Sequence, residues 1–177
     1  IHSISQLLKL TNYEIYSKTG IGLAISERIR WQAKAVQDNK IYKMQSLILP
    51  LKPRIYVDIE TDLNQKKIWM IGVYSEKSKT YYPLLAQTYE YEKDILLQFL
   101  NILKKEPNSS ICSYSGTKFD EQFLLKRFQH YKLETKLIEN VTDLNKSISH
   151  TLAIPINNYK VSSLGTYFGY SYKHPQI

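Results

Sequence analysis

The sequence predicts an α/β fold built on a mixed sheet, with a small α-helical piece at its N-terminus. From residue 54 onward, one stretch alternates apolar and polar residues with the period of two that is typical of strands, and two further strand-like stretches follow it, the first of them apolar. After them, helical and strand patterns alternate along the chain, an order typical of a sheet flanked by helices. We therefore expect three antiparallel strands followed by alternating helices and strands.

The N-terminal piece covers residues 1–46. The spacing of its apolar residues predicts two helices, at 4–10 and 26–36. Between them, Gly20 and Gly22 flank an apolar residue. This pattern allows a tight turn whose backbone N–H groups hold a phosphate at a helix start. Two prolines mark residues 47–53 as a linker.

Residues 54–177 are predicted to form the second domain. The expected strands lie at 54–60, 68–74, 80–85, 110–114 and 137–143. The expected helices lie at 90–105, 118–131, 144–152 and 161–167.

Two carboxylates stand near the end of the first strand of this domain. Asp58 and Glu60 are two residues apart, so both project from the same face of the sheet. Like charges side by side are costly unless a cation compensates them, and hard oxygen ligands favour Mg²⁺ or Mn²⁺. The alternative is a polar strand end before a turn. Spacing alone favours that alternative.

A third acid, Asp120, falls in the first turn of a predicted helix, directly after a strand and the turn at 115–117. From there it can face the end of the first strand. The alternative role is helix capping, because a carboxylate near a helix N-terminus is stabilised by the helix dipole.

Taken together, several stretches resemble the DnaQ-like (DEDD) exonucleases of the ribonuclease-H-like superfamily, over about residues 54–170. The first two motifs correspond to YVDIET at 56–61, IGV at 71–73, YSG at 114–116 and FD at 119–120. The later motifs of a predicted ribonuclease-H-like nuclease branch correspond to VTDL at 141–144 and SLGTYFG at 163–169.

This resemblance implies a 3′-to-5′ exonuclease, on DNA rather than RNA. Asp58, Glu60 and Asp120 are then expected to hold two Mg²⁺ or Mn²⁺ ions, one activating a water and the other stabilising the leaving oxygen. Thr61 and Tyr114 are expected to contact the nucleic acid. An endonuclease or a ribonuclease on the same fold is the alternative enzyme.

The sequence departs from the family in its third motif, which supplies a His or Tyr base followed by a last metal-binding Asp. No Asp or Glu follows Asp143, and no acid follows Tyr159 or His174. The two-metal site is therefore incomplete in this sequence. We favour a chain cut before its last helix over an omitted segment or a degenerate nuclease that binds without cleaving. Asp143 itself is interpreted as a strand-end acid that orients the next helix.

The N-terminal piece is similar to a helix-hairpin-helix element, through Gly20, Gly22 and the apolar residues that follow them. Such an element grips the nucleic-acid backbone through glycine N–H groups without reading sequence. The resemblance also implies a RecB-like nuclease domain upstream in the same polypeptide. A plain helical hairpin is the alternative.

Composition agrees with a nucleic-acid partner. The formal net charge is +8, from 24 Lys and Arg against 16 Asp and Glu. A single cysteine and the absence of an apolar run of about 20 residues predict a cytoplasmic protein with no membrane segment. Fifteen tyrosines offer rings for stacking on bases, although tyrosines more often pack with their hydroxyls at the surface. The stacking candidates are Tyr81, Tyr82, Tyr89, Tyr91, Tyr167, Tyr170 and Tyr172.

Overall fold

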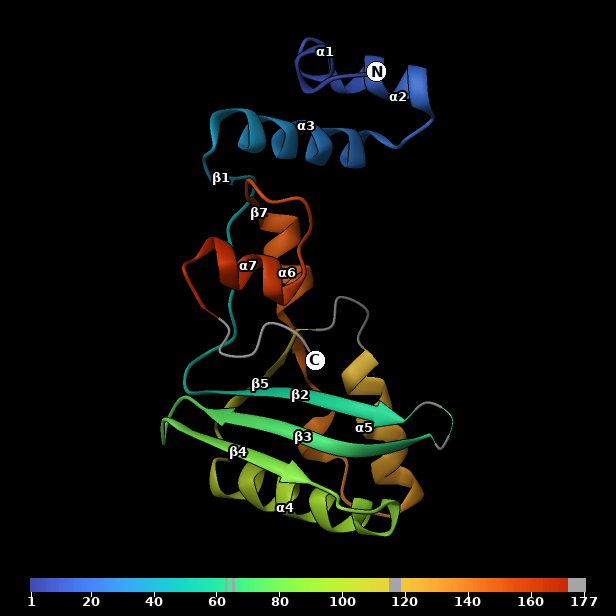
Figure 1. Ribbon diagram of the computed structural model, residues 1–177, viewed down its shortest axis with the longest axis vertical. Coiled ribbons are helices and arrows are strands. Elements are labelled where there is room, and N and C mark those ends of the chain that lie inside the picture. The colour runs from blue at the N-terminus through green and yellow to red at the C-terminus, as the bar shows by residue number, and fades with distance from the viewer. Residues whose placement is uncertain (63, 65, 115–118, 172–177) are drawn as a thin grey trace. The chain divides into compact units, whose positions relative to one another are not determined.

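The computed structural model describes residues 1–62, 64, 66–114 and 119–171 (Figure 1). Its contacts divide the chain into two units: the helical unit, residues 1–48 with 146–177, and the sheet unit, residues 49–145. By contacts, residues 146–177 thus group with the N-terminus, whereas the sequence analysis groups them with the residues from 54 onward. The predicted fold class, a mixed-sheet α/β fold with a small helical N-terminal piece, is confirmed.

The sheet unit contains a five-stranded mixed sheet in the order β4-β3-β2-β5-β6. Its strands are β2 (Arg54–Asp62), β3 (Lys67–Ser75), β4 (Thr80–Leu85), β5 (Ser110–Ser113) and β6 (Thr142–Asp143). The first three pair antiparallel, while β5 runs parallel to β2 and β6 parallel to β5. The predicted strand at 137–143 is wrong over most of its length, because residues 136–138 form a 3-10 turn instead. The central strand is therefore β2, which carries the first two acids.

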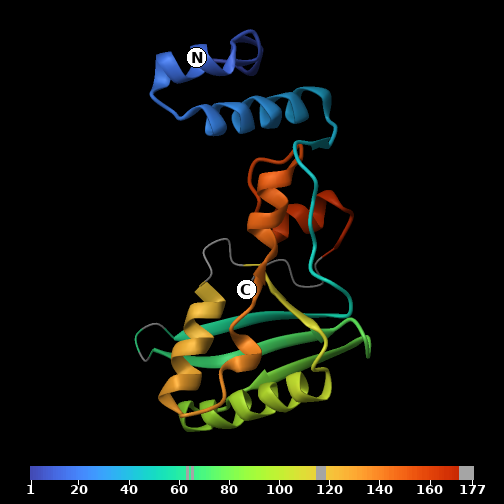
Figure 2. The same cartoon turned by 180° about the vertical axis from the view of Figure 1, so that it is seen from behind.

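Two helices, α4 (Glu92–Lys105) and α5 (Phe119–His130), pack together on one side of this sheet (Figure 2). The apolar stripe of α4 faces the sheet as its periodicity requires. The rings of Phe99 in α4 and Phe128 in α5 meet edge to face, with centroids 6.3 Å apart. Alternate residues of β2, namely Ile55, Val57 and Ile59, are buried in the same core. The side chains between them belong to the opposite face of the sheet.

The helical unit contains the remaining elements. They are α1 (Ile4–Leu8), α2 (Asn12–Thr19), α3 (Leu23–Asp38), β1 (Tyr42–Lys43), α6 (Leu144–Thr151), β7 (Leu152–Ala153) and α7 (Val161–Tyr167). The α2 helix was not predicted, although Thr11 and Glu14 form a capping box at its start. The β1 and β7 strands pair antiparallel, and the Gln32 amide donates to the Ile154 carbonyl over 2.7 Å. Among the described residues, no helix is long and apolar enough to cross a membrane.

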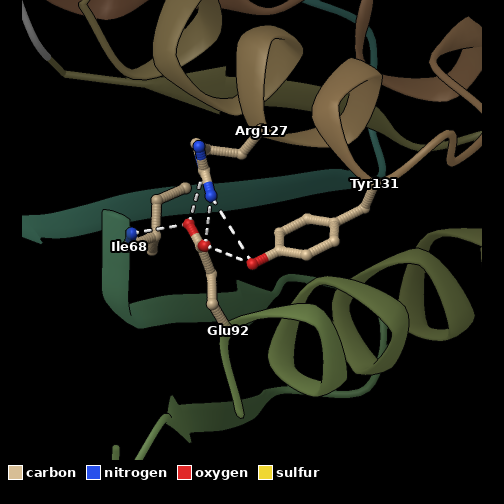
Figure 3. A network of polar contacts seen from close by, with 4 residues as sticks. All are labelled: Ile68, Glu92, Arg127 and Tyr131. Atoms are coloured by element: carbon tan, nitrogen blue, oxygen red, sulfur yellow. Dashed lines mark hydrogen bonds and ion pairs between the residues drawn. The ribbon is translucent and has the colours of Figure 1, made fainter. Parts of the chain in front are cut away.

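A buried ionic network joins three elements of the sheet unit (Figure 3). The carboxylate of Glu92, fully buried at the start of α4, accepts hydrogen bonds from Arg127 Nε over 2.7 Å and from the Tyr131 hydroxyl over 2.8 Å. It also accepts one from the backbone N–H of Ile68 in β3, over 2.8 Å. Burial alone would raise the pKa of Glu92, but these hydrogen bonds outweigh it and lower the pKa. The network therefore ties α5, which carries Asp120, to β3 and α4.

Replacing Glu92 by Ala is expected to destabilise the protein by about 3–5 kcal/mol, because it leaves the Arg127 guanidinium buried without its counter-charge. The double variant, Glu92→Ala with Arg127→Ala, should lose much less stability than the sum of the losses in the two single variants. Urea unfolding of the four proteins of this cycle measures both effects. The matched control is Glu134→Ala, which breaks a half-exposed ion pair with Lys104 of 3.1 Å and should cost about 1 kcal/mol or less. Equal losses for Glu92→Ala and Glu134→Ala would contradict a structural role for the network.

Candidate active site

The two acids of β2 share one face of the sheet, as the sequence predicts. Asp58 and Glu60 are exposed, while the residues on either side of them along the strand face the core. In the antiparallel pairing with β3, Asp58 lies opposite Gly72 and Glu60 opposite Met70. Partial loss of water around the Asp58 carboxyl raises its pKa. Both side chains thus stand on the face of the sheet that α4 and α5 leave open.

Asp120 occupies the first turn of α5 and is buried. Burial, together with the negative charges of Asp58, Asp143 and Glu60, raises its pKa to about 6. The contribution of these charges means that the carboxylates of Asp58, Asp143 and Glu60 lie within electrostatic range of Asp120. The fold therefore brings four acids from β2, α5 and β6 into one neighbourhood.

Asp143 acts on two neighbouring parts of the structure. Its Oδ1 accepts a hydrogen bond of 2.9 Å from the backbone N–H of Asn145, so it caps α6. The sequence predicts this capping role, because Asp143 stands between a predicted strand and a predicted helix. Its charge also acts on Asp120, because β6 pairs with β5 next to the strand end that leads toward α5. This effect on Asp120 depends on the order of the strands in the sheet, which the sequence around Asp143 does not reveal.

The donor set matches a hard divalent cation in chemistry. Carboxylate oxygens are the ligands that Mg²⁺ and Mn²⁺ prefer, and a cation would relieve the repulsion that raises the pKa of Asp120. As the side chains stand, no three His, Cys, Asp or Glu residues within the described parts of the chain are spaced to hold one metal ion. The acids therefore lie near one another without enclosing a coordination site.

The other predicted contact residues lie in both units. Thr61 follows a register shift in β2, and Tyr114 follows the end of β5. The predicted turn at 115–117, with residue 118 where the next helix was predicted to begin, lies outside the described residues. In the helical unit, Gly20 ends α2 with a φ of 71° and Gly22 precedes α3. A Cβ atom at either glycine would meet nothing within 4 Å, so the tip of this hairpin is open.

The open face of the sheet carries a row of tyrosines beside the acids. Tyr56, Tyr74 and Tyr81 lie opposite one another on β2, β3 and β4. The rings of Tyr56 and Tyr74 are tilted, with centroids 6.2 Å apart. The sequence analysis singled out Tyr81 for stacking but not its two partners, because cross-strand register is not visible in the sequence.

A central strand with two acids on one face, in a sheet of this order, defines a nuclease-type α/β fold. A family model of the RNase H superfamily matches residues 55–177, and the chain belongs to this superfamily. A search of the curated proteins gives no significant match. The match begins at the start of β2 and includes all the acids described above.

Because burial and neighbouring carboxylates disfavour the charge of Asp120, removing that charge by mutation should stabilise the protein. The pKa of Asp120 in the folded protein, about 6, is above its ordinary value of 3.8, so the folded state loses stability as the pH rises through this interval. Asp120→Asn should therefore stabilise the metal-free protein by about 1–3 kcal/mol at pH 7.5. The gain should shrink by more than half at about pH 4.5, where the carboxyl of the folded protein is protonated.

Urea unfolding in EDTA at the two pH values measures this effect. Glu134→Gln, at a half-exposed acid outside the cluster, is the control and should change stability by about 1 kcal/mol or less at both pH values. A variant Asp120→Asn that is less stable than the unaltered protein at pH 7.5 would show that the four acids do not repel one another.

Proposed function

We propose that this chain is a divalent-metal-dependent nuclease domain of the DnaQ type, which hydrolyses DNA from its 3′ end. The observation that carries the proposal is the raised pKa of Asp120, about 6, caused by burial and by three neighbouring carboxylates within a fold of the RNase H superfamily. Strongly perturbed acids clustered on one surface are more typical of a catalytic site than of a structural one.

In this proposal, Asp58, Glu60 and Asp120 hold the cation, and Asp143 adds negative charge beside them. When bound, the metal supplies an activated water and stabilises the leaving oxygen of the phosphodiester. The contribution of this chain is to present deprotonated carboxylates. Because the pKa of Asp120 is about 6, that residue is mostly ionised at neutral pH and takes up a proton in mild acid. Metal affinity should therefore fall below about pH 6.

The distribution of charge supports a nucleic-acid substrate. In the helical unit, ten Lys and Arg stand against three acidic residues, whereas the sheet unit is nearly neutral, with fourteen Lys and Arg against thirteen acids. A basic unit attracts the phosphate backbone without regard to sequence. The hairpin at Gly20 and Gly22 is proposed to grip that backbone as a helix-hairpin-helix element.

The catalytic part of the proposal is tested with Asp58→Asn. This change removes one negative charge from the cluster, and it should lower the cleavage rate of single-stranded DNA by at least about 100-fold, in line with loss of a catalytic metal. Cleavage is followed on DNA labelled at the 5′ or the 3′ end with Mg²⁺ or Mn²⁺. A ladder shortened from the 3′ end supports an exonuclease, and internal cuts support an endonuclease. Glu134→Gln, on the surface, should leave the rate unchanged.

No cleavage by the unaltered chain with either metal, on DNA or RNA, would overturn the nuclease proposal. A nucleic-acid-binding module without catalysis is the second candidate. It is favoured by one observation, that no three acids in the described residues are spaced to hold an ion. Titration with Mn²⁺ distinguishes the two, since a module without catalysis should not bind the ion in a manner that depends on Asp58.

The hairpin is tested with Gly22→Asp. Gly22 has a φ of −53°, open space around it, and the N-cap position of α3, so an Asp fits there without strain and caps the helix. The same carboxylate would accept hydrogen bonds from the N–H groups that are proposed to hold phosphate, and its negative charge would repel the DNA backbone. We therefore expect a protein at least as stable as the original that binds DNA about 10-fold more weakly at low salt. Fluorescence anisotropy across salt concentrations measures this, with Gly22→Ala as the uncharged control. Unchanged binding would show that the hairpin does not hold the backbone.

A further inference from the structure

The end of the Tyr81 side chain lies close over the backbone of Gly72. Its hydroxyl oxygen lies 2.9 Å from the point that a Cβ atom of residue 72 would occupy, and its ring carbons Cε2 and Cζ lie at 3.5 and 3.6 Å. Real Cβ atoms essentially never show a contact as short as the first. The ring therefore lies across Gly72 because this residue has no side chain.

This position brings the phenol hydroxyl to the candidate active site. Gly72 is the cross-strand partner of Asp58, whereas Tyr81 itself pairs with Tyr74, one step further along the same face. Tyr81 thus leans diagonally from the tyrosine row toward the pair formed by Asp58 and Gly72. Directly paired residues on one face of an antiparallel sheet have Cβ positions about 5 Å apart. The hydroxyl is therefore no more than about 8 Å from the Cβ atom of Asp58.

The hydroxyl is available for a ligand. Within the described parts of the chain, it has no hydrogen-bond partner, and the residue is 54% exposed. The hydroxyls of Tyr131 and Tyr159 are engaged within the protein, whereas that of Tyr74, like that of Tyr81, has no hydrogen bond to another described residue. What distinguishes Tyr81 is its position over Gly72, the partner of Asp58. An exposed hydroxyl that lies over Gly72 and has no hydrogen bond to another described residue is free to donate to an external acceptor.

We propose that the Tyr81 hydroxyl donates a hydrogen bond to a non-bridging phosphate oxygen of a nucleic-acid strand bound at Asp58 and Glu60. This inference rests on the proposed function and names a substrate contact that the acids alone do not provide. A phenol suits this place because it is a neutral donor. A Lys or Arg here would instead pair with Asp58 and compete with the metal. The exposed ring beside the hydroxyl offers a flat apolar surface to the adjoining sugar or base.

The experiment uses the full chain and labelled single-stranded oligothymidylate, with Ca²⁺ as an oxygen-binding cation of looser geometry than Mg²⁺. Tyr81→Phe removes only the hydroxyl, and it should raise the Kd about 10-fold, the usual size of a lost hydrogen bond to a charged acceptor. Tyr74→Phe is the matched control, one pair away on the same face, and should change the Kd by less than about twofold. Thermal unfolding checks that both variants remain folded.

Gly72→Ala gives an independent test, because the new Cβ must displace the hydroxyl while leaving its chemistry intact. It should weaken binding about as much as Tyr81→Phe. In the double variant, the Cβ meets only ring carbons at 3.5 and 3.6 Å, which is ordinary contact, so Gly72→Ala should add less than about twofold to the effect of Tyr81→Phe. This lack of additivity would not arise if Tyr81 only stabilised the sheet.

The proposal is overturned if Tyr81→Phe stays within twofold of the unaltered protein, or if the unaltered chain binds no oligonucleotide in Ca²⁺. Its failure is distinguishable from that of the nuclease proposal. Binding that depends on Tyr81, without cleavage in Mg²⁺ or Mn²⁺, supports the phosphate contact and overturns the nuclease. Cleavage that is indifferent to Tyr81→Phe overturns the contact alone.

Discussion

The buried carboxylate of Glu92 fixes the geometry on which the rest of the sheet unit depends. A charge without access to water is tolerated only when hydrogen bonds and an opposite charge replace its hydration, and here Arg127, Tyr131 and the N–H of Ile68 do so. The three donors belong to β3, α5 and the residue just after α5. Because the carboxylate of Glu92 bonds to all three donors at once, α5 has little freedom to slide or rotate against the sheet. The first turn of α5, with Asp120, is thereby held toward the acids of the other strands.

Glu92 and Asp120 show how environment assigns different tasks to the same functional group. Both carboxyls are buried at the start of a helix, yet the pKa of Glu92 is lowered, whereas that of Asp120 is raised to about 6. Arg127 and a backbone N–H surround the first, and three like charges surround the second. The first arrangement stabilises the fold, and the second costs stability in the absence of a cation. Proteins maintain costly clusters of this kind mainly where function requires them.

The sequence was sufficient for features that depend on local patterns. The period of two placed Asp58 and Glu60 on one face, and alternation of strands and helices predicted the mixed sheet that the structure confirms. It was insufficient where a contact depends on register or strand order. In the sequence, Glu92 cannot be told from other acids in the first turn of a helix, so its buried network is not predicted. Likewise, no residue near Asp143 reveals that its strand pairs with β5. The approach of Tyr81 to Gly72 arises from a diagonal across two strands, which only the folded sheet defines.

The separation of charge between the two units has a physical reason under the proposed function. A site that must hold a divalent cation loses affinity when a Lys or Arg pairs with its carboxylates, and no Lys or Arg in the described parts of the chain contributes to the pKa shift of Asp58. A phosphodiester strand nevertheless needs attraction to approach four acids. The helical unit, with ten Lys and Arg against three acidic residues, carries most of the excess positive charge that attracts such a strand. At the acids themselves, a neutral hydroxyl such as that of Tyr81 contacts phosphate without adding a charge. Positive charge on one unit and neutral donors beside the carboxylates are therefore complementary solutions to the same electrostatic conflict.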